Sequence, residues 1–248
     1  MKLHEALGIS SGDVVAFVGA GGKSGAILAV SGGLAREGTK VLVAPTTKML
    51  LGEADRVGPL VVSEDANELR AKAESALSEA SAVVVGLRML SKNRVGGLDS
   101  EWIGDLAGLA GVVLVEADGS RRRPIKGTAD HEPAIPAAAT LVVAVGNVRA
   151  LGTPVDEEHV HRPEIFSDLT GVGPGQSITA GAFATALAQG SLAKVPKGAR
   201  TAALITGVQP GRLMSDASVV TRELWRRGVK NVVLSSLPTQ TPAQVWVP

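Results

Sequence analysis

The strongest fold signal in this chain is the stretch Val14-Val15-Ala16-Phe17-Val18-Gly19-Ala20-Gly21-Gly22-Lys23-Ser24. An apolar, β-branched run predicts a strand, the glycines predict a tight turn, and the residues after Lys23-Ser24 fit a helix. Backbone N–H groups of such a loop approach phosphates closely, and the helix N-terminus adds a positive dipole end. We therefore predict that a nucleotide binds to Gly19, Ala20, Gly21, Gly22, Lys23, Ser24 and Gly25. Lys23 would lie near the β- and γ-phosphates and Ser24 would bind Mg²⁺. The alternative is a plain strand-to-helix turn with a solvated lysine.

The predicted loop is shorter than the usual one. Phe17 stands where the standard pattern has its first glycine, so the loop begins only at Gly19. In this it resembles the compressed phosphate loop of the Mur-type ATP-dependent ligases. A dinucleotide site fits less well, because Ser24 occupies its third glycine position and the second strand ends in Ala44-Pro45-Thr46 without a carboxylate.

Composition excludes several classes of protein. The chain has 248 residues, 45% of them hydrophobic, which is enough for one α/β domain over residues 1–248. A net charge of +1 and an aromatic content of 2% argue against a nucleic-acid partner. There is no cysteine for disulfides or thiolate sites. The absence of a leader pattern or a long apolar run predicts no membrane partner and a cytoplasmic location.

Strand and helix patterns alternate along the chain. Apolar runs predict strands at 14–18, 40–44, 82–86, 112–116, 141–146, 201–206 and 231–235, and helical spacing marks 24–37, 65–80, 100–109, 179–188 and 215–227. This order predicts an α/β fold of the P-loop NTPase type, a doubly wound, mostly parallel sheet with helices on both faces. Ligands of such sheets bind beyond the carboxyl ends of the strands, so we interpret 119–139 and 151–176 as functional loops.

Two carboxylates follow the strand at 112–116. Glu116 and Asp118 are two residues apart, so on an ideal strand they face the same way. Beside a phosphate loop, an acid at a strand end holds the Mg²⁺ shell or orients water. We predict that both contribute to the metal site and to catalysis, with Glu116 favoured as the direct ligand. Solubilising acids at a strand end are the alternative.

A basic cluster comes next, at Arg121-Arg122-Arg123 and Lys126. Guanidinium groups at this place fit the binding of phosphate or an anionic substrate, and we predict a catalytic role for Arg121. His131 and Glu132 are candidates for acid–base chemistry, with His131 the one we assign. Solvated loop residues are the alternative for all of them.

Thr46, Thr47 and Lys48 follow the second strand, where hydroxyls either bind the γ-phosphate or metal or simply cap a helix. The densest polar cluster contains His159, His161 and Arg162. Its histidines lack the spacing of a helical zinc motif, which favours contact with a substrate or partner over zinc. We expect Arg121, His131 and this cluster to meet in one cleft facing the phosphate loop.

Taken together, these segments resemble the YqeC family, accessory proteins of selenium-dependent hydroxylases. The resemblance covers most of residues 12–170 and rests on Val18–Ser24, Thr46-Thr47-Lys48, Glu116-Ala117-Asp118-Gly119-Ser120-Arg121, His131-Glu132-Pro133 and Glu158-His159-Val160-His161-Arg162-Pro163. It implies a nucleotide-binding protein that assists the maturation of molybdenum-containing hydroxylases. After the strand at 201–206, the run Ile205-Thr206-Gly207-Val208-Gln209-Pro210 departs from the family pattern and lacks a guanine-specific carboxylate, which favours ATP over GTP.

Two functions fit these features. One is an Mg²⁺- and ATP-dependent enzyme, an NTPase or a ligase-like protein, that activates an anionic substrate by phosphoryl transfer. The other is a nucleotide-gated carrier that delivers the molybdenum cofactor to an apo-hydroxylase. The resemblance implies the molybdenum cofactor or a selenium species as the second ligand, and a hydroxylase or cofactor-maturation protein as partner.

Overall fold

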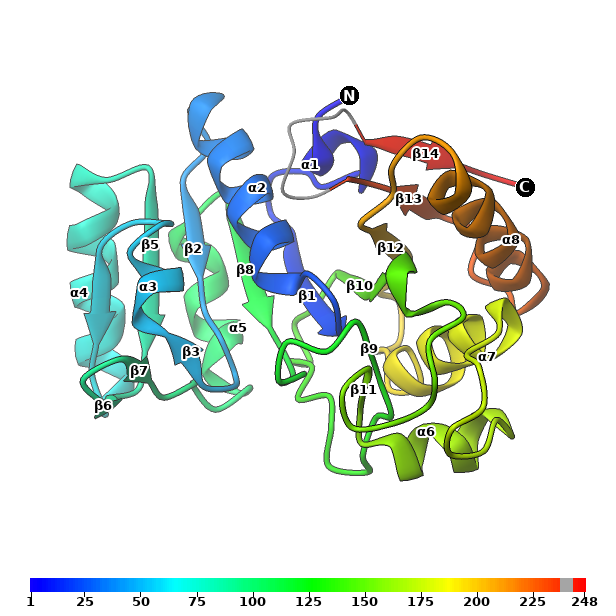
Figure 1. The fold of residues 1–248 in the computed structure, drawn as a ribbon. Helices are drawn as coiled ribbons and strands as arrows, with labels where there is room; N and C mark the ends of the chain where they lie inside the picture. The colour runs from blue at the N-terminus through cyan, green and yellow to red at the C-terminus, as the bar shows by residue number, and fades with distance from the viewer. Residues whose placement is uncertain (237–242) are drawn as a thin grey trace.

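The computed structural model describes residues 1–236 and 243–248 (Figure 1). The strands are β1 (Val14–Gly19), β2 (Val41–Val43), β3 (Met49–Leu50), β4 (Leu60–Val62), β5 (Ala82–Gly86), β6 (Met89–Ser91), β7 (Arg94–Val95), β8 (Val112–Glu116), β9 (Ile125–Lys126), β10 (Leu141–Asn147), β11 (Val160–His161), β12 (Arg200–Thr206), β13 (Val232–Leu234) and β14 (Gln244–Trp246). The helices are α1 (Leu3–Ala6), α2 (Lys23–Arg36), α3 (Leu51–Ala54), α4 (Ala66–Glu79), α5 (Trp102–Leu106), α6 (Pro163–Thr170), α7 (Ala180–Thr185) and α8 (Arg212–Arg226), with 3₁₀ turns η1 (Ala107–Leu109) and η2 (Val148–Ala150) and a π-helical turn η3 (Ala186–Ser191).

A nine-stranded sheet organises the fold, in the order β14-β13-β12-β10-β1-β8-β2-β5-β4. Only its edge strand β14 runs antiparallel, against β13, and the other eight strands are parallel. The central strand β1 pairs with β10 on one side and β8 on the other. The predicted α/β fold with a large, mostly parallel sheet is therefore confirmed.

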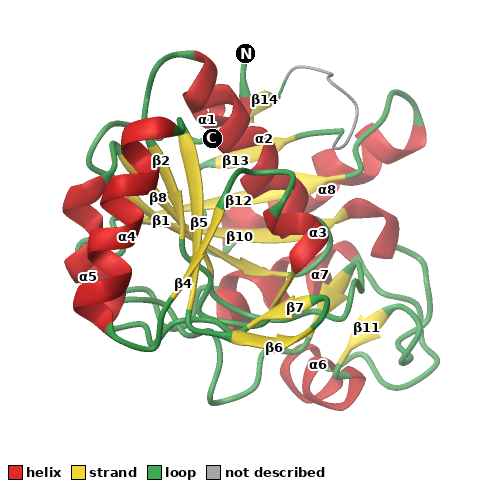
Figure 2. Cartoon of the chain, turned by 90° about the vertical axis from the view of Figure 1, so that its left-hand side faces the viewer, coloured by secondary structure: helices red, strands yellow, loops and turns green. Residues whose placement is uncertain are grey.

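Helices cover both faces of the sheet. Since alternate residues of each strand point to opposite faces, successive residues of a strand belong to different cores. Ala16 and Val18 of β1 belong to the core that includes α4, α5, α7 and α8. Val15 and Phe17 belong to the second core, which includes α1, α2 and α3. Figure 2 shows α4 and α5 together on one side of the strands and α3 on the other. Both apolar faces of β1 are fully enclosed, which explains its continuous apolar run.

Every predicted strand and helix is present, with small differences at the ends. The second strand is shorter than predicted, and the helices at 100–109 and 179–188 each end in a different helical turn, η1 and η3. The edge strands β4 and β14 were not predicted, since three residues carry too little periodicity to be recognised.

The long segments also contain structure that the sequence reading missed. The segment 119–139 contains β9, and 151–176 contains β11 and α6. Helix α6 has proline in its first turn and ends at Gly171 with φ 73°, both ordinary helix boundary signals that its short length obscured. Within the residues that the structure describes, no helix combines the length and the apolar character needed to cross a membrane.

The carboxyl ends of the parallel strands meet at one edge of the sheet. In Figure 1 the arrowheads of β1 and β8 point toward β9 and β11, which pair with each other below the main sheet. The segments that leave β1, β2, β8 and β10 therefore enclose the same region.

Candidate functional site

A cavity of about 1260 Å³ lies at this edge of the sheet. The predicted residues that line it are Gly21, Gly22, Lys23, Ser24, Gly25, Thr47, Lys48, Glu116, Arg121, His159, His161 and Arg162. They come from the ends of β1, β2 and β8 and from β11. Segments far apart in the sequence thus meet in one cleft, as expected for a parallel sheet.

The glycine loop after β1 has a backbone that only glycine adopts easily. Gly19 and Gly21 have φ values of 90° and 76°. A Cβ on Gly19 would come within 2.5 Å of the Val145 carbonyl, and one on Gly21 within 2.5 Å of the Pro124 carbonyl. Helix α2 then begins at Lys23 without a side-chain cap on its first N–H groups. The loop consequently presents free backbone donors to the cavity, which is what an anion at a helix N-terminus requires.

Lys23 lies inside the protein rather than in solvent, which removes the alternative of a solvated lysine. The residue is only 3% exposed. Its Nζ donates to the Gly19 carbonyl at 2.5 Å and lies 3.1 Å from Asp118 Oδ1. A buried ammonium is costly unless it is paired, so Asp118 holds Lys23 in place beside the loop.

Asp118 contacts the glycine loop on the side away from the cavity. Its Oδ2 accepts a hydrogen bond from the Gly19 N–H at 2.9 Å and lies 3.1 Å from Lys126 Nζ. The side chain is buried and does not line the cavity. Strand β8 ends at Glu116, so Asp118 lies past the strand, and of the two carboxylates Glu116 is the one that lines the cavity.

Glu116 is the predicted carboxylate that faces the cavity. Burial raises its pKa to about 7; the Lys23 ammonium opposes this rise, whereas Glu53 and Asp118 add to it. A hydrogen bond with the Ser24 side chain further stabilises the carboxylate. Ser24 and Glu116 therefore bring two side-chain oxygens together at the start of α2.

Lys126 and Glu132 form the centre of an ion-pair network that the sequence did not predict, since Lys126 was read as part of a basic cluster and Glu132 as a candidate for acid–base chemistry. Lys126 is 2% exposed, and its Nζ contacts Asp118, the Gly119 carbonyl at 2.8 Å and Glu132 Oε2 at 2.5 Å. Glu132 also receives two hydrogen bonds from Arg162, at 2.6 and 3.1 Å. Burial alone would raise the pKa of Glu132, but the hydrogen bonds from Arg162 and Lys126 outweigh it and hold the pKa at about 2. The only signals in the sequence were the positions of these residues beside Arg121–Arg123 and His131.

The histidine cluster is anchored by the pairing of β11 with β9, which places His161 opposite Lys126. Burial lowers the pKa of His161 to about 4, and the charges of Lys126 and Arg162 add to the effect. His159 Nδ1 lies 2.7 Å from Asp156 Oδ1. In the described part of the chain, neither histidine belongs to a group of three metal-ligating side chains.

Several predicted residues lie outside the cavity lining. His131 is exposed and does not line the cavity, so it does not meet Arg121 and His161 as expected. The Thr46 hydroxyl donates to the Ala134 carbonyl at 3.1 Å, a contact between loops. Gly19 and Ala20 donate their N–H groups to Asp118 and to the Val145 carbonyl. These contacts shape the loop without facing its cavity.

The cavity also contains side chains that the sequence did not single out. Glu53, Arg94, Asn147, Arg149 and Thr206 all line it. The Thr206 hydroxyl donates to the Gly21 carbonyl and ties β12 to the glycine loop. Their positions depend on the order of strands in the sheet, which a single sequence does not reveal.

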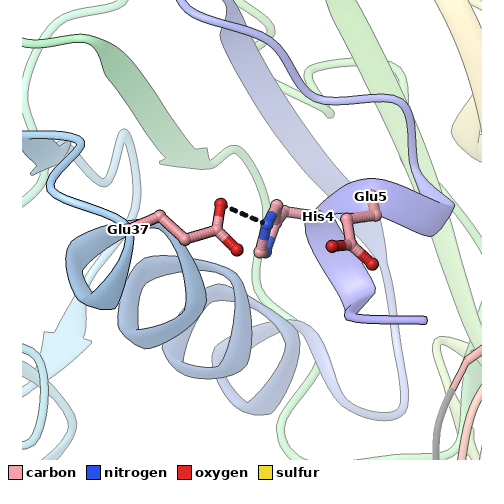
Figure 3. A group of neighbouring side chains, drawn as sticks. All are labelled: His4, Glu5 and Glu37. Atoms are coloured by element: carbon pink, nitrogen blue, oxygen red, sulfur yellow. Dashed lines mark hydrogen bonds and ion pairs between the residues drawn. The ribbon is translucent and has the colours of Figure 1, made fainter.

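One cluster with metal-ligating side chains lies elsewhere, at His4, Glu5 and Glu37 (Figure 3). His4 Nε2 lies 3.1 Å from Glu37 Oε2, and Lys2 pairs with the same carboxylate. Glu37 follows the last residue of α2, whereas Lys23 begins that helix. The cluster joins α1 to the far end of α2 and is separate from the cavity.

Comparison with known proteins adds a family. A family model described as "YqeC protein" matches residues 15–164. A relative from Escherichia coli (strain K12), named "Uncharacterized protein YqeC", is 31% identical over 191 residues, which cover 75% of this chain and 73% of the relative. The matched region includes the glycine loop, Glu116 to Glu132 and the His159–Arg162 segment, and it ends before α7.

Proposed function

Because this chain belongs to the YqeC family, and because its glycine loop opens on a cavity beside a buried lysine, we propose that it is an Mg²⁺-dependent ATP-binding protein. In this proposal it activates an anionic substrate by phosphoryl transfer, and its setting is the maturation of molybdenum-containing, selenium-dependent hydroxylases. The fold is then of the P-loop type with a shortened, Mur-ligase-like phosphate loop.

The observation that carries the proposal is the placement of Lys23. Its ammonium is buried at the end of the glycine loop and contacts the Gly19 carbonyl and Asp118. Burying the Lys23 ammonium stabilises the fold little by itself, because desolvation of the charge offsets its attraction to Asp118. A triphosphate would supply a second negative partner at the same place.

The metal expectation rests on the chemistry of Ser24 and Glu116. Both side chains line the cavity, and both offer the hard oxygen ligands that Mg²⁺ prefers. Mg²⁺ keeps several of its waters and needs few protein ligands, so two are sufficient. The bound ion would neutralise charge on the phosphates. Asp118 acts in this scheme as the partner of Lys23 rather than as a ligand.

The cavity has room for more than one ligand. Its volume of about 1260 Å³ exceeds the roughly 300–1,000 Å³ of ordinary small-molecule sites. Cationic side chains on its walls include Lys48, Arg94, Arg121 and Arg149. These charges favour an anionic second substrate and stabilise charge that develops during phosphoryl transfer.

The proposal is tested by calorimetry and thermal shift with ATP, GTP, CTP and their diphosphates, with and without Mg²⁺. At a nucleotide concentration of 100 Kd we expect a stabilisation of about 2.7 kcal/mol, and the strongest response to Mg²⁺-ATP. Lys23→Met removes the charge at similar volume and should weaken binding by about 100-fold or more, since charge-assisted contacts are the strong ones.

Lys72→Met is the matched control, because Lys72 is exposed on α4 and its ion-pair partner among the described residues is Glu68. It should bind nucleotide like the wild type. A flat response of the wild-type protein to every nucleotide would refute the proposed function. Multiple-turnover release of phosphate that a small anion stimulates would identify an enzyme, whereas stimulation by a partner protein alone would identify a carrier.

A further inference from the structure

We propose that the turn Ser120–Arg123, the arginine turn, binds a second oxyanion with at least two negative charges, next to the phosphates of the nucleotide. The inference deepens the proposed function and rests on it for the neighbouring nucleotide. The proposal places the charged group of the second substrate at the arginine turn. A phosphate monoester is the chemical class that fits this site, because it carries two negative charges.

The backbone of the arginine turn is unfavourable for arginine. The Arg123 N–H donates to the Ser120 carbonyl at 2.9 Å, which closes a four-residue turn. Its two central residues, Arg121 and Arg122, have φ values of 46° and 62°. Turns with positive φ at both central positions strongly prefer Asn-Gly, because a Cβ is disfavoured there. Strain of this kind concentrates at ligand-binding sites.

The strained residues share one location. In residues 1–236 and 243–248, the non-glycine residues with positive φ are Arg121, Arg122 and Arg162, and all three line the cavity. Positive φ at a non-glycine residue costs stability. Because it occurs at three arginines that line the same cavity, it points to a role for their guanidinium groups in that cavity.

The guanidinium groups of the turn have no protein anion to neutralise them. Within the described residues, Arg121, Arg122 and Arg123 form no ion pair or side-chain hydrogen bond. Asp118 and Glu132 are already engaged by Lys23, Lys126 and Arg162. The other acids of the cavity lining are Glu53, Glu116, Glu157 and Glu164, and none of them pairs with the turn in the described part of the chain. The low pKa of His161, due to burial and then to Lys126, Arg162 and Arg121, reports the resulting positive potential. Three unpaired guanidinium groups fit a ligand with more than one charge, and their forks match phosphate oxygens.

The position of the turn places such an anion beside the nucleotide. The Pro124 carbonyl, one residue after the turn, accepts from the Asn147 N–H at 2.9 Å, and a Cβ on Gly21 would lie 2.5 Å from that carbonyl. On the other side of the turn, a Cβ on Gly119 would lie 3.9 Å from Thr47 Oγ1. The arginine turn is therefore held between the glycine loop and the end of β2.

The double variant Arg121→Asn/Arg122→Gly tests the proposal, because it keeps the turn and removes both charges. The probes are inorganic phosphate and glycerol 2-phosphate, titrated by calorimetry with the full-length protein saturated with Mg²⁺ and a non-hydrolysable ATP analogue. We expect affinity for the probes to fall at least about 10-fold, while Tm rises by about 4 °C or more as strain is relieved. Tighter binding of glycerol 2-phosphate than of phosphate would identify an organic monoester as the ligand class, and the reverse would identify free phosphate.

The control is Arg56→Asn/Arg222→Gln, which removes two exposed charges outside the cavity and should leave probe affinity unchanged. Arg123→Gln is a second variant, which removes a charge of the turn at a residue that does not have positive φ. Unchanged probe affinity in both the double variant and Arg123→Gln would overturn the proposal. Nucleotide binding is measured separately. Failure of the wild-type protein to bind the analogue counts against the proposed function, loss of the analogue alone in the arginine variants counts against a separate anion site, and loss of the probes alone supports the site at the arginine turn.

Discussion

Glu116 shows how one residue sets the pH response of the site. Its carboxylate ends β8 and faces the cavity, where burial raises the pKa to about 7 from an ordinary value of 4.5. Between pH 4.5 and 7, the Glu116 carboxyl group is therefore protonated in the folded protein but ionised in the unfolded chain. The stabilising contribution is complete at low pH and is lost as the pH rises through 7.

We predict that Glu116→Gln stabilises the metal-free protein at pH 8 by about 2 kcal/mol and changes it little at pH 5. The amide keeps the shape of the side chain but carries no charge to desolvate. Urea unfolding of both proteins at the two pH values, in the presence of a chelator, measures the difference. An equal gain at both pH values would contradict the raised pKa.

At the scale of elements, the junction between β1 and α2 depends on glycine for two different reasons. Gly21 has positive φ, and its missing Cβ makes room for Pro124 and Asn147. Gly25 lies in α2, where a Cβ would meet nothing within 4 Å. The first glycine is required by tertiary packing, whereas the second is only a weak helix former.

We predict that Gly21→Ala destabilises the protein by about 2 kcal/mol or more, from backbone strain and overpacking. Gly25→Ala, the matched control in the same loop–helix junction, should stabilise it by about 0.5–1 kcal/mol. Urea midpoints of the two variants, compared with the wild type, test both expectations. Equal effects of the two substitutions would show that the close approach of Pro124 to Gly21 is not maintained in solution.

Across the whole molecule, a chain of ion pairs connects the glycine loop to the residue that follows β11. It runs from Lys23 through Asp118, Lys126 and Glu132 to Arg162. Lys23, Arg162 and the segment from Asp118 to Glu132 thus meet in one largely buried network, and the pairing of β9 with β11 brings Arg162 to it. The low pKa of Glu132 is the energetic signature of this assembly.

We predict that Glu132→Gln destabilises the protein by about 2–3 kcal/mol at pH 7. Because the pKa of Glu132 is lowered from 4.5 to about 2, the charged carboxylate stabilises the wild type above pH 4.5, and this contribution is lost as the pH falls toward 2. The difference between the two proteins should therefore shrink on acidification. Thermal unfolding across that range measures it.

The control for this prediction is Glu64→Gln, which removes an exposed partner of Arg88. Exposed pairs contribute little, so a change below about 0.5 kcal/mol is expected. If Glu132→Gln lowered the free energy of unfolding by the same amount down to pH 3, packing rather than charge would account for the effect.

The local order of residues in the sequence determined much of this architecture. Apolar runs such as 14–18 and 112–116 predicted buried parallel strands, because such strands need both faces apolar. The residues around Gly21 and Lys23 predicted a strand, a loop and a helix from adjacent positions alone. Since parallel strands place their carboxyl ends at one edge, the meeting of Lys23, Glu116 and His161 in one cavity was also predictable.

Which charged residues are buried, and what they contact, depends on the tertiary structure. From the sequence, Lys126 and Arg121 belong to one basic run, yet Lys126 is enclosed by acids and Arg121 is exposed in a strained turn. His131 and Glu132 are neighbours, but only Glu132 joins the network. A charge is stable inside a protein only beside a partner. The acids that enclose Lys126 lie only eight and six residues away, whereas Lys23 and Arg162, which pair with the same two acids, come from distant segments. Which charges meet therefore depends on how these segments pack and not on residue type alone.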